Sequence, residues 1–110
     1  MACSFLIVVP TLNSHALLPK LLCSLQAQSW HQWRVVFIDG PSGLQHRQWL
    51  QQCCVDEPRC SWQKQSPEVQ GIFGAMSQGF AMAAPDEWLL FWGSDDWAAG
   101  PDVLQQLMQA

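Results

Sequence analysis

The sequence predicts an α/β fold in which helices flank a mainly parallel sheet. Short apolar runs rich in β-branched residues alternate with segments of helical periodicity along the chain, and clusters of turn-forming residues end the runs. No internal repeat or long linker interrupts this alternation. Because parallel neighbours need a crossover connection, strands separated by helices indicate β-α-β units.

Two strands and two helices are expected in the first half of the chain. The continuous apolar run Phe5–Val9 suits a central strand covered on both faces, and Trp33–Ile38 repeats that pattern. Between them a helical stripe, with Pro19 in its first turn, predicts a helix that ends near Gln28. The stripe consists of Leu17, Leu18, Leu21, Leu22 and Leu25. A weaker helical periodicity covers Leu44–Cys54.

The second half repeats the alternation. Cys60–Gln65 is interpreted as a short strand, and Trp88–Trp92 is a further apolar strand. A helix is expected after Gly71 and ends before Pro85, because apolar residues recur there at helical spacing. These residues are Ile72, Met76, Phe80 and Ala83. Gly100-Pro101 opens a last helix with an apolar face of Val103, Leu104, Leu107 and Met108.

Composition limits the classes of function. A chain of 110 residues with 49% hydrophobic and 13% charged residues is expected to form one globular domain. Five basic against nine acidic residues leave a net charge of -4, so a nucleic-acid partner is not expected. The run Phe5–Val9 is too short to cross a bilayer and follows no basic residue, so neither a transmembrane segment nor a signal peptide is expected.

The cysteines and histidines indicate neither a disulfide framework nor a zinc site. The chain has five cysteines: Cys3, Cys23, Cys53, Cys54 and Cys60. Their number is odd and none of them forms a C-x-x-C pair. Reduced thiols and a cytoplasmic location are therefore expected. His15, His31 and His46 are isolated along the chain, and each is expected at the surface or in packing rather than as a metal ligand.

Polar residues follow three of the predicted strands directly. Ligands of such sheets bind beyond the carboxyl ends of the strands, where the sequence places Thr11 and Asn13, then Asp39, then Asp95 and Asp96. Neither a dinucleotide-binding glycine fingerprint nor a phosphate-binding P-loop is present. A diphosphate would thus need another source of positive charge, and adjacent carboxylates such as Asp95-Asp96 can hold Mg²⁺ or Mn²⁺.

Each of these residues taken singly also fits a structural role. Asp39 before Gly40 can shape a turn, and Asp95 can cap its own loop. Thr11 and Asn13 precede a helix that they would be expected to cap. Their occurrence together at three strand ends favours a ligand site. Most aromatic residues are expected in the core, whereas Trp97 follows the carboxylates and is a candidate for ligand contact.

Four segments together resemble the family-2 glycosyltransferases of GT-A fold. They are Val9–Asn13, Val36–Gly40 with Ser42, Gly71–Gly79, and Glu87–Asp96. The resemblance implies a Rossmann-like half domain that binds a nucleotide-sugar donor, with a UDP-sugar expected. It also implies that Thr11 and Asn13 contact the nucleoside, Asp39 the base, Asp95 the ribose, and Asp96 a Mn²⁺ or Mg²⁺ ion on the diphosphate.

The chain also departs from the family pattern. Phe73, Gly74, Ser77 and Gln78 stand where related sequences often have polar residues, among them an Asp, an Asn and a Lys. The resemblance implies that residues 1–110 are a single truncated domain whose acceptor half, including the general base, is absent. It further implies inverting transfer to a glycan or lipid-linked acceptor of unknown identity. Two hypotheses stay open: the donor-binding portion of an enzyme, or a degenerate non-catalytic module that forms homo-oligomers.

Overall fold

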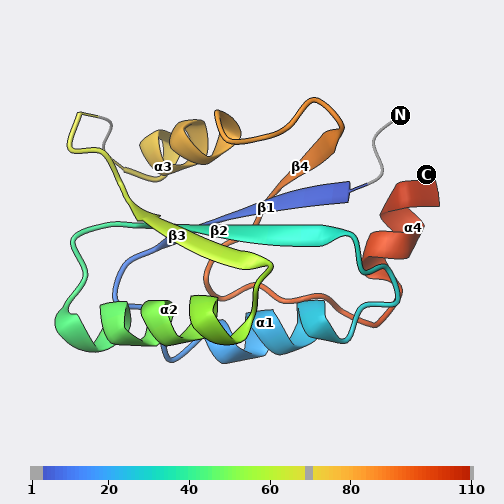
Figure 1. Ribbon diagram of the computed structural model, residues 1–110, viewed down its shortest axis with the longest axis horizontal. Coiled ribbons are helices and arrows are strands. Elements are labelled where there is room, and N and C mark those ends of the chain that lie inside the picture. Colours follow the sequence, from blue (N-terminus) through green and yellow to red (C-terminus); the bar gives the residue numbers. More distant parts are fainter. Residues whose placement is uncertain (1–3, 69–70, 110) are drawn as a thin grey trace.

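The computed structural model describes residues 4–68 and 71–109, and its centre is a sheet of four strands. The strands are β1 (Ser4–Thr11), β2 (Trp33–Asp39), β3 (Cys60–Lys64) and β4 (Glu87–Phe91). They lie in the order β3-β2-β1-β4, and all three neighbouring pairs are parallel (Figure 1). The predictions of a mainly parallel sheet and of a central first strand are confirmed.

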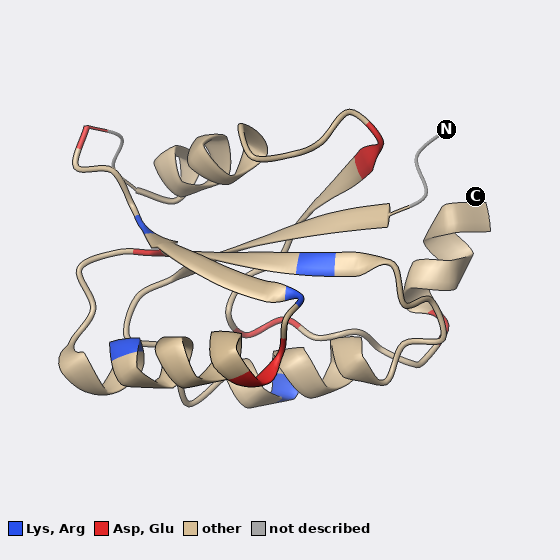
Figure 2. Ribbon diagram, in the orientation of Figure 1, with Lys and Arg blue, Asp and Glu red and all other residues tan. Residues whose placement is uncertain are grey.

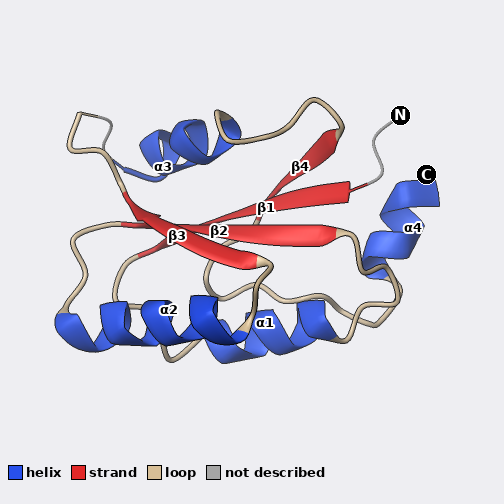
Figure 3. Ribbon diagram, viewed as in Figure 1, coloured by secondary structure: helices blue, strands red, loops and turns tan. Residues whose placement is uncertain are grey.

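Helices cover both faces of this sheet. They are α1 (Leu18–Gln26), α2 (Leu44–Asp56), α3 (Gly71–Phe80) and α4 (Val103–Gln109). Figure 3 shows α1 and α2 side by side on one face and α3 on the other, while α4 lies near the amino ends of the strands. The α/β fold class is thereby confirmed, and each helix and strand expected from the sequence is present.

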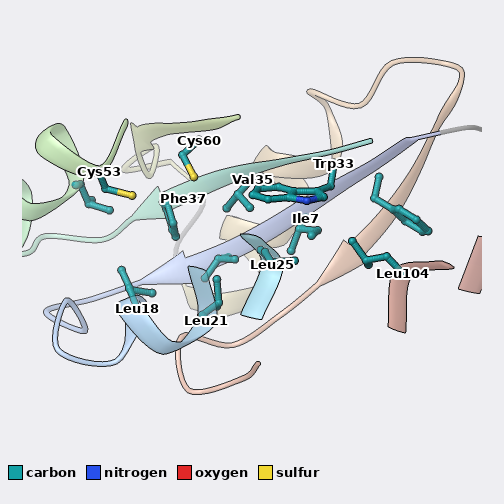
Figure 4. Close-up of a cluster of buried hydrophobic side chains, with 13 residues drawn as sticks. Ile7, Leu18, Leu21, Leu25, Trp33, Val35, Phe37, Cys53, Cys60 and Leu104 are labelled. Carbon is teal, nitrogen blue, oxygen red and sulfur yellow. The ribbon is translucent and has the colours of Figure 1, made fainter. Parts of the chain in front are cut away.

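The two faces of β1 contribute to two separate hydrophobic clusters. Phe5, Ile7 and Val9 pack with residues of β2, α1 and α2 in the larger cluster, most of which Figure 4 labels. Leu6 and Val8 point to the opposite face and pack with Ala75 of α3. An uninterrupted apolar strand is stable here because both of its faces are removed from water.

Element boundaries differ from the sequence expectations by a few residues. Helix α1 ends at Gln26 rather than near Gln28, and the side chain of Gln28 connects the end of α1 to the start of α4. Its amide nitrogen donates to Ser24 O and Gly100 O, and its amide oxygen accepts from Leu104 N. A buried glutamine with all these partners stabilises the docking of the last helix.

The apolar stripe that predicts helix α3 is not the face that the helix turns toward the sheet. Ile72 and Phe80 are 59% and 57% exposed, whereas Ala75 and Gly79 lie against the sheet. A Cβ atom at Gly79 would overlap Val8 Cγ1 and lie 2.8 Å from Val8 Cγ2, so only glycine allows this close approach. The helix also ends at Phe80 rather than continuing to Ala83.

The described cysteines carry free thiols: Cys23, Cys53, Cys54 and Cys60. Cys3 lies outside the described residues. Across residues 4–68 and 71–109, none of the helices has both the length and the apolar character that crossing a membrane requires.

Candidate functional site

The loops that follow β1, β2 and β4 are joined to one another by hydrogen bonds at the carboxyl edge of the sheet. Asn13 N donates to Ser42 Oγ at 2.9 Å, and Gly43 N donates to Asn13 Oδ1 at 2.7 Å. On the other side, the Ser14 and Ser94 hydroxyls are 2.8 Å apart, and Ser94 Oγ also donates to Pro10 O. The three strand ends named by the sequence therefore form one connected surface.

Asp39, the last residue of β2, is the most enclosed acidic side chain of this surface. Its side chain is fully buried, and its Oδ1 atom accepts hydrogen bonds from Thr11 Oγ1 at 2.8 Å and Ser42 Oγ at 2.7 Å. His46 Nε2 lies 3.0 Å from the same oxygen. A buried carboxylate requires such partners, because an uncompensated charge away from water is costly. One strand, one loop and one helix thus surround this one side chain.

A cavity of about 490 Å³ opens beside Asp39 at the ends of β2 and β3. Arg47 and Lys64 line it together with Asp39, and they bring two positive charges to its wall. The remaining lining residues are Gly40, Pro41, Gln65, Ser66, Pro67 and Gly71. Such a concave site with a few converging polar groups is typical of small-molecule binding.

Gln78 of α3 forms hydrogen bonds with Lys64 and Ser66, two of the residues that line this cavity. Its amide nitrogen donates to Lys64 O and Gln63 Oε1, each at 2.9 Å, and its amide oxygen accepts from Ser66 N at 2.8 Å. Gln78 is one of the residues at which the chain departs from the family pattern. In the structure this side chain joins α3 to the end of β3 and to the residue Ser66 that follows it closely.

The carboxylates of Asp95 and Asp96 lie in the exposed loop after β4. Asp96 Oδ2 accepts a hydrogen bond from Gly93 N at 2.7 Å. A Cβ atom placed on Gly93 would lie 2.9 Å from Asp95 Oδ1 and 3.3 Å from Asp96 Oδ2. Both carboxylates therefore lie close to Gly93. Figure 2 shows this acidic loop running beside α1. Within the described part of the chain no group of three or more metal-ligating side chains occurs.

This donor set fits Mg²⁺ or Mn²⁺ only if other ligands complete the coordination. Two exposed carboxylates supply oxygen atoms, which these ions prefer, and both ions commonly take one or two protein carboxylates while phosphate and water fill the other positions. Asp95 and Asp96 would therefore hold the ion together with a bound diphosphate. A metal site made of protein groups alone would need more ligands than these residues provide.

Thr11 and Asn13 do not cap helix α1, although the sequence allowed that role. Helix α1 has no side-chain hydrogen bond at its cap, and the Thr11 hydroxyl is used by Asp39. Asn13 adopts a left-handed backbone with φ of 50° and binds Gly43 N, just before α2. Both residues thus organise the strand-end loops, and their contact with a nucleoside stays a prediction.

Trp97 follows the carboxylates and is half exposed. The Nζ atom of Lys20 lies 3.4 Å from the centre of its indole ring, so the ammonium group covers one face of that ring. The ligand contact expected of Trp97 from the sequence stays a prediction.

Four residues near the candidate site were missed by reasoning from strand ends, because they come from a helix, a loop and an edge strand. Arg47 and Lys64 line the cavity, while His46 and His15 form an edge-on ring pair whose centroids are 5.6 Å apart. His15 and His46 are isolated along the chain, but the fold brings their rings together, and the buried His46 ring lies in packing as expected. One signal was available: His46 and Arg47 fall in the first turn of the helix after Asp39, which returns to the strand end.

Comparison with known proteins gives a consistent result over nearly the whole chain. The family model described as "Glycosyl transferase family 2" matches residues 6–110. The chain is 31% identical over 105 residues to proteins named "PGL/p-HBAD biosynthesis glycosyltransferase". These proteins come from Mycobacterium tuberculosis (strain ATCC 25177 / H37Ra) and Mycobacterium bovis (strain BCG / Pasteur 1173P2). That match covers 94% of the chain and 40% of each relative, so the chain spans less than half of their length.

Solved structures show the same fold. TarS 1-349 from S. aureus superposes with a TM-score of 0.81 at 24% identity, covering 96% of this chain and 31% of TarS. A mannosyltransferase from Pyrobaculum calidifontis in complex with GDP-Man and Mn²⁺ gives a TM-score of 0.79 at 17% identity, with the same coverage. TarS 1-349 in complex with UDP-GlcNAc gives 0.72 at 25% identity, covering 96% of this chain and 30% of TarS.

Proposed function

The chain belongs to glycosyl transferase family 2, and from that premise we propose that its strand-end surface binds the nucleotide-sugar donor of a sugar transfer, with a UDP-sugar as donor. The observation that carries the proposal is the Oδ2 atom of Asp39. This atom is buried, has no hydrogen-bond partner among the described residues, and belongs to a side chain that lines the cavity. An N–H group of a ligand base would satisfy it.

The neighbouring residues suit a nucleotide in charge and position. Arg47 and Lys64 favour an anionic ligand in the cavity beside Asp39. In this proposal Thr11 and Asn13 support the nucleoside from the β1 end, and Asp95 accepts from the ribose hydroxyls. The ligand thereby crosses from the β2 end to the β4 end of the connected surface.

Asp96, together with Asp95, is the residue that would hold Mn²⁺ or Mg²⁺ at the diphosphate. Such an ion supplies Lewis-acid stabilisation of the negative charge on a leaving nucleoside diphosphate. The chain's own part is to present two carboxylates on a loop that the Ser14–Ser94 contact ties to the end of β1. The Mn²⁺ bound by the related mannosyltransferase is consistent with this assignment.

The acceptor side of the reaction is proposed to lie in residues beyond this donor portion. An inverting transfer needs a base that deprotonates the attacking hydroxyl, and the donor residues named here leave that role to another part of the enzyme. The mycobacterial relatives, of which the chain spans 40%, are named for PGL/p-HBAD biosynthesis. A glycan or a lipid-linked molecule is proposed as the acceptor, and a cytoplasmic location is proposed from the free thiols of the described cysteines.

Calorimetric titration of UDP, with GDP as the comparison ligand, tests the proposal in the presence and absence of Mn²⁺. We expect UDP to bind with a requirement for the ion. Asp39→Asn should weaken UDP at least roughly tenfold, because it replaces an acceptor with a donor facing the ligand. Asp96→Ala should abolish the effect of Mn²⁺.

Asp86 provides the control, since it is an exposed acidic residue that precedes β4 at the opposite end of the sheet. Asp86→Asn should bind UDP like the unaltered protein. A folded protein that gives no heat with UDP, with or without Mn²⁺, would contradict the proposed function. Equal UDP affinity in Asp96→Ala and the unaltered protein, at saturating Mn²⁺, would exclude Asp96 as the metal ligand.

The alternative function, a non-catalytic module that self-associates, is favoured by one surface. Helix α3 and the edge strand β4 expose Ile72, Phe73, Phe80, Trp88 and Phe91. Phe80 and Phe91 stack with ring centroids 6.4 Å apart and help to line an apolar groove of about 350 Å³. Exposed apolar patches of this kind often mark interaction sites.

Sedimentation velocity distinguishes the two functions. Self-association through this surface predicts a dimer or larger species that becomes monomeric in Phe73→Asp, because Phe73 is 80% exposed and its replacement leaves the core intact. A monomeric unaltered protein that binds UDP would exclude the alternative.

A further inference from the structure

The two oxygens of the Asp39 carboxylate lie in unequal surroundings. Oδ1 accepts hydrogen bonds from the hydroxyl groups of Thr11 and Ser42, and His46 Nε2 lies 3.0 Å from it. Oδ2 has no hydrogen bond to any described residue, and its nearest cation is Arg47 Nε at 3.5 Å. The carboxylate is thus fixed through one oxygen, while the other is left for a ligand.

His46 differs from the two hydroxyl donors because it can change its charge. Its side chain is fully buried in the first turn of α2, and its ring meets that of His15 edge-on at an interplanar angle of 68°. The contact between Nε2 and Oδ1 is short but not aligned as a hydrogen bond, so its effect on Asp39 is mainly electrostatic and steric. Contacts of this kind often tighten only when a ligand binds.

We propose that His46 is a positioning residue for nucleotide binding, which holds the Asp39 carboxylate with Oδ2 toward the cavity and weakens binding when it becomes protonated. This inference rests on the proposed function of Asp39 as the acceptor for the ligand base. It adds a residue of α2 to the donor site and a dependence of that site on pH.

The surrounding charges indicate the direction of the pH effect. Burial lowers the pKa of His46 below its ordinary value, and the nearby His15 and Arg47 lower it further, while Asp39 opposes them. His46 is therefore neutral at neutral pH, and Asp39 keeps its full strength as an acceptor. In acid the imidazolium pairs with Asp39, draws its negative charge toward Oδ1, and makes Oδ2 a weaker acceptor for a ligand N–H group.

Calorimetric titration of UDP across about pH 5 to about pH 8, with saturating Mn²⁺, tests the inference on the full chain. The unaltered protein should lose affinity as the pH falls through the pKa of His46. His46→Gln keeps a neutral polar side chain beside Asp39, so it should bind more tightly than His46→Leu at neutral pH. It should lose the part of the acid effect that comes from His46, while the part that comes from the phosphate of UDP remains. His46→Leu should bind roughly tenfold more weakly at neutral pH, because Asp39 loses a polar neighbour.

His31 is the matched control, since it is an exposed histidine in the loop before β2, at the opposite edge of the sheet. His31→Gln should show the pH profile of the unaltered protein. The inference is wrong if His46→Gln loses as much affinity in acid as the unaltered protein, or if His46→Leu binds UDP as tightly as the unaltered protein at neutral pH.

Nitrogen NMR of the His46 ring separates a failure of this inference from a failure of the proposed function. Asp39→Asn should lower the pKa of His46 further, because Asp39 raises it. An unchanged pKa would show that the pair does not exist and would overturn the inference even if UDP binds. A protein that binds no UDP refutes the proposed function, and with it the nucleotide role of His46, whatever the NMR result.

Discussion

The two acidic sides of the strand-end surface are built in opposite ways. On the β2 side, Asp39 is buried and held by Thr11, Ser42 and His46 before any ligand arrives. On the β4 side, Asp95 and Asp96 are exposed. The carboxylate of Asp96 accepts a hydrogen bond from the backbone N–H of Gly93. The first side is preorganised by the fold, whereas the second would be ordered by an ion and a diphosphate. Stability and binding should therefore respond differently to changes on the two sides.

The largest difference is expected when each carboxylate is removed. Asp39→Ala should lower the free energy of unfolding by roughly 2 kcal/mol or more, because it leaves buried donors without their acceptor. Asp96→Ala should change it by no more than about 0.5 kcal/mol, since the side chain is exposed. Urea denaturation of both variants measures the contrast, and equal losses of stability would contradict it.

A smaller effect is expected from the hydroxyl that β1 contributes. Thr11→Val keeps the shape of the side chain and removes its hydrogen bond to buried Asp39, so it should cost roughly 1.5 kcal/mol. Ser61→Ala serves as the control, because Ser61 is exposed on β3. A Thr11→Val protein as stable as the control would show that the β2 side does not depend on this contact.

Acid should destabilise the β2 side before the rest of the fold. The folded pKa of His46 lies below its ordinary value of 6.5, so the unfolded chain binds more protons as the pH falls from 6.5 toward the folded pKa. Stability is thus greatest above pH 6.5 and declines below it, by at most about 1.4 kcal/mol per pH unit. The decline should be absent in His46→Gln.

A separate acid effect comes from Glu57 and has a different window. Arg59 lowers the pKa of Glu57 from 4.5 to about 2, so its contribution is present above 4.5 and is lost as the pH falls toward 2. Thermal unfolding at a series of pH values separates the two windows. A decline above pH 4.5 that is the same in His46→Gln would assign it to another group.

The smallest effect is expected on the β4 side. Lys20→Met removes the ammonium group above Trp97 while keeping an aliphatic chain, and it should cost about 0.5 kcal/mol. Urea denaturation checks this value, with Lys64→Met as a control for the loss of one exposed charge. A loss of stability in Lys20→Met larger than that in Thr11→Val would contradict the view that the β4 side is ordered only by a ligand.

Much of the fold was predictable because its signals are local. The runs Phe5–Val9 and Trp33–Ile38 are buried on both faces, and each predicted the position of a strand without knowledge of its neighbours. The stripe on α3 shows the limit of this reasoning. Apolar residues mark the helix, but Gly79 determines which side approaches the sheet, since close contact with Val8 needs the absence of a side chain.

The candidate site was predictable only in part. Asp39 follows its strand directly, so the general rule for α/β sheets found it. His46 and Arg47 reach the same point from α2, and Lys64 from β3, because of how those elements pack. A periodicity that assigns elements says nothing of which polar side chains meet at their ends.

The sequence by itself determined the alternation of strands and helices and the three strand ends that carry polar residues. These properties depend on the spacing of apolar residues and on turn-forming residues within short segments. Only the tertiary structure decided that Thr11 binds Asp39 across 28 residues, that His15 meets His46, and that one carboxylate oxygen stays unpaired beside a cavity. Contacts between distant segments follow from packing and strand order, which no local pattern encodes.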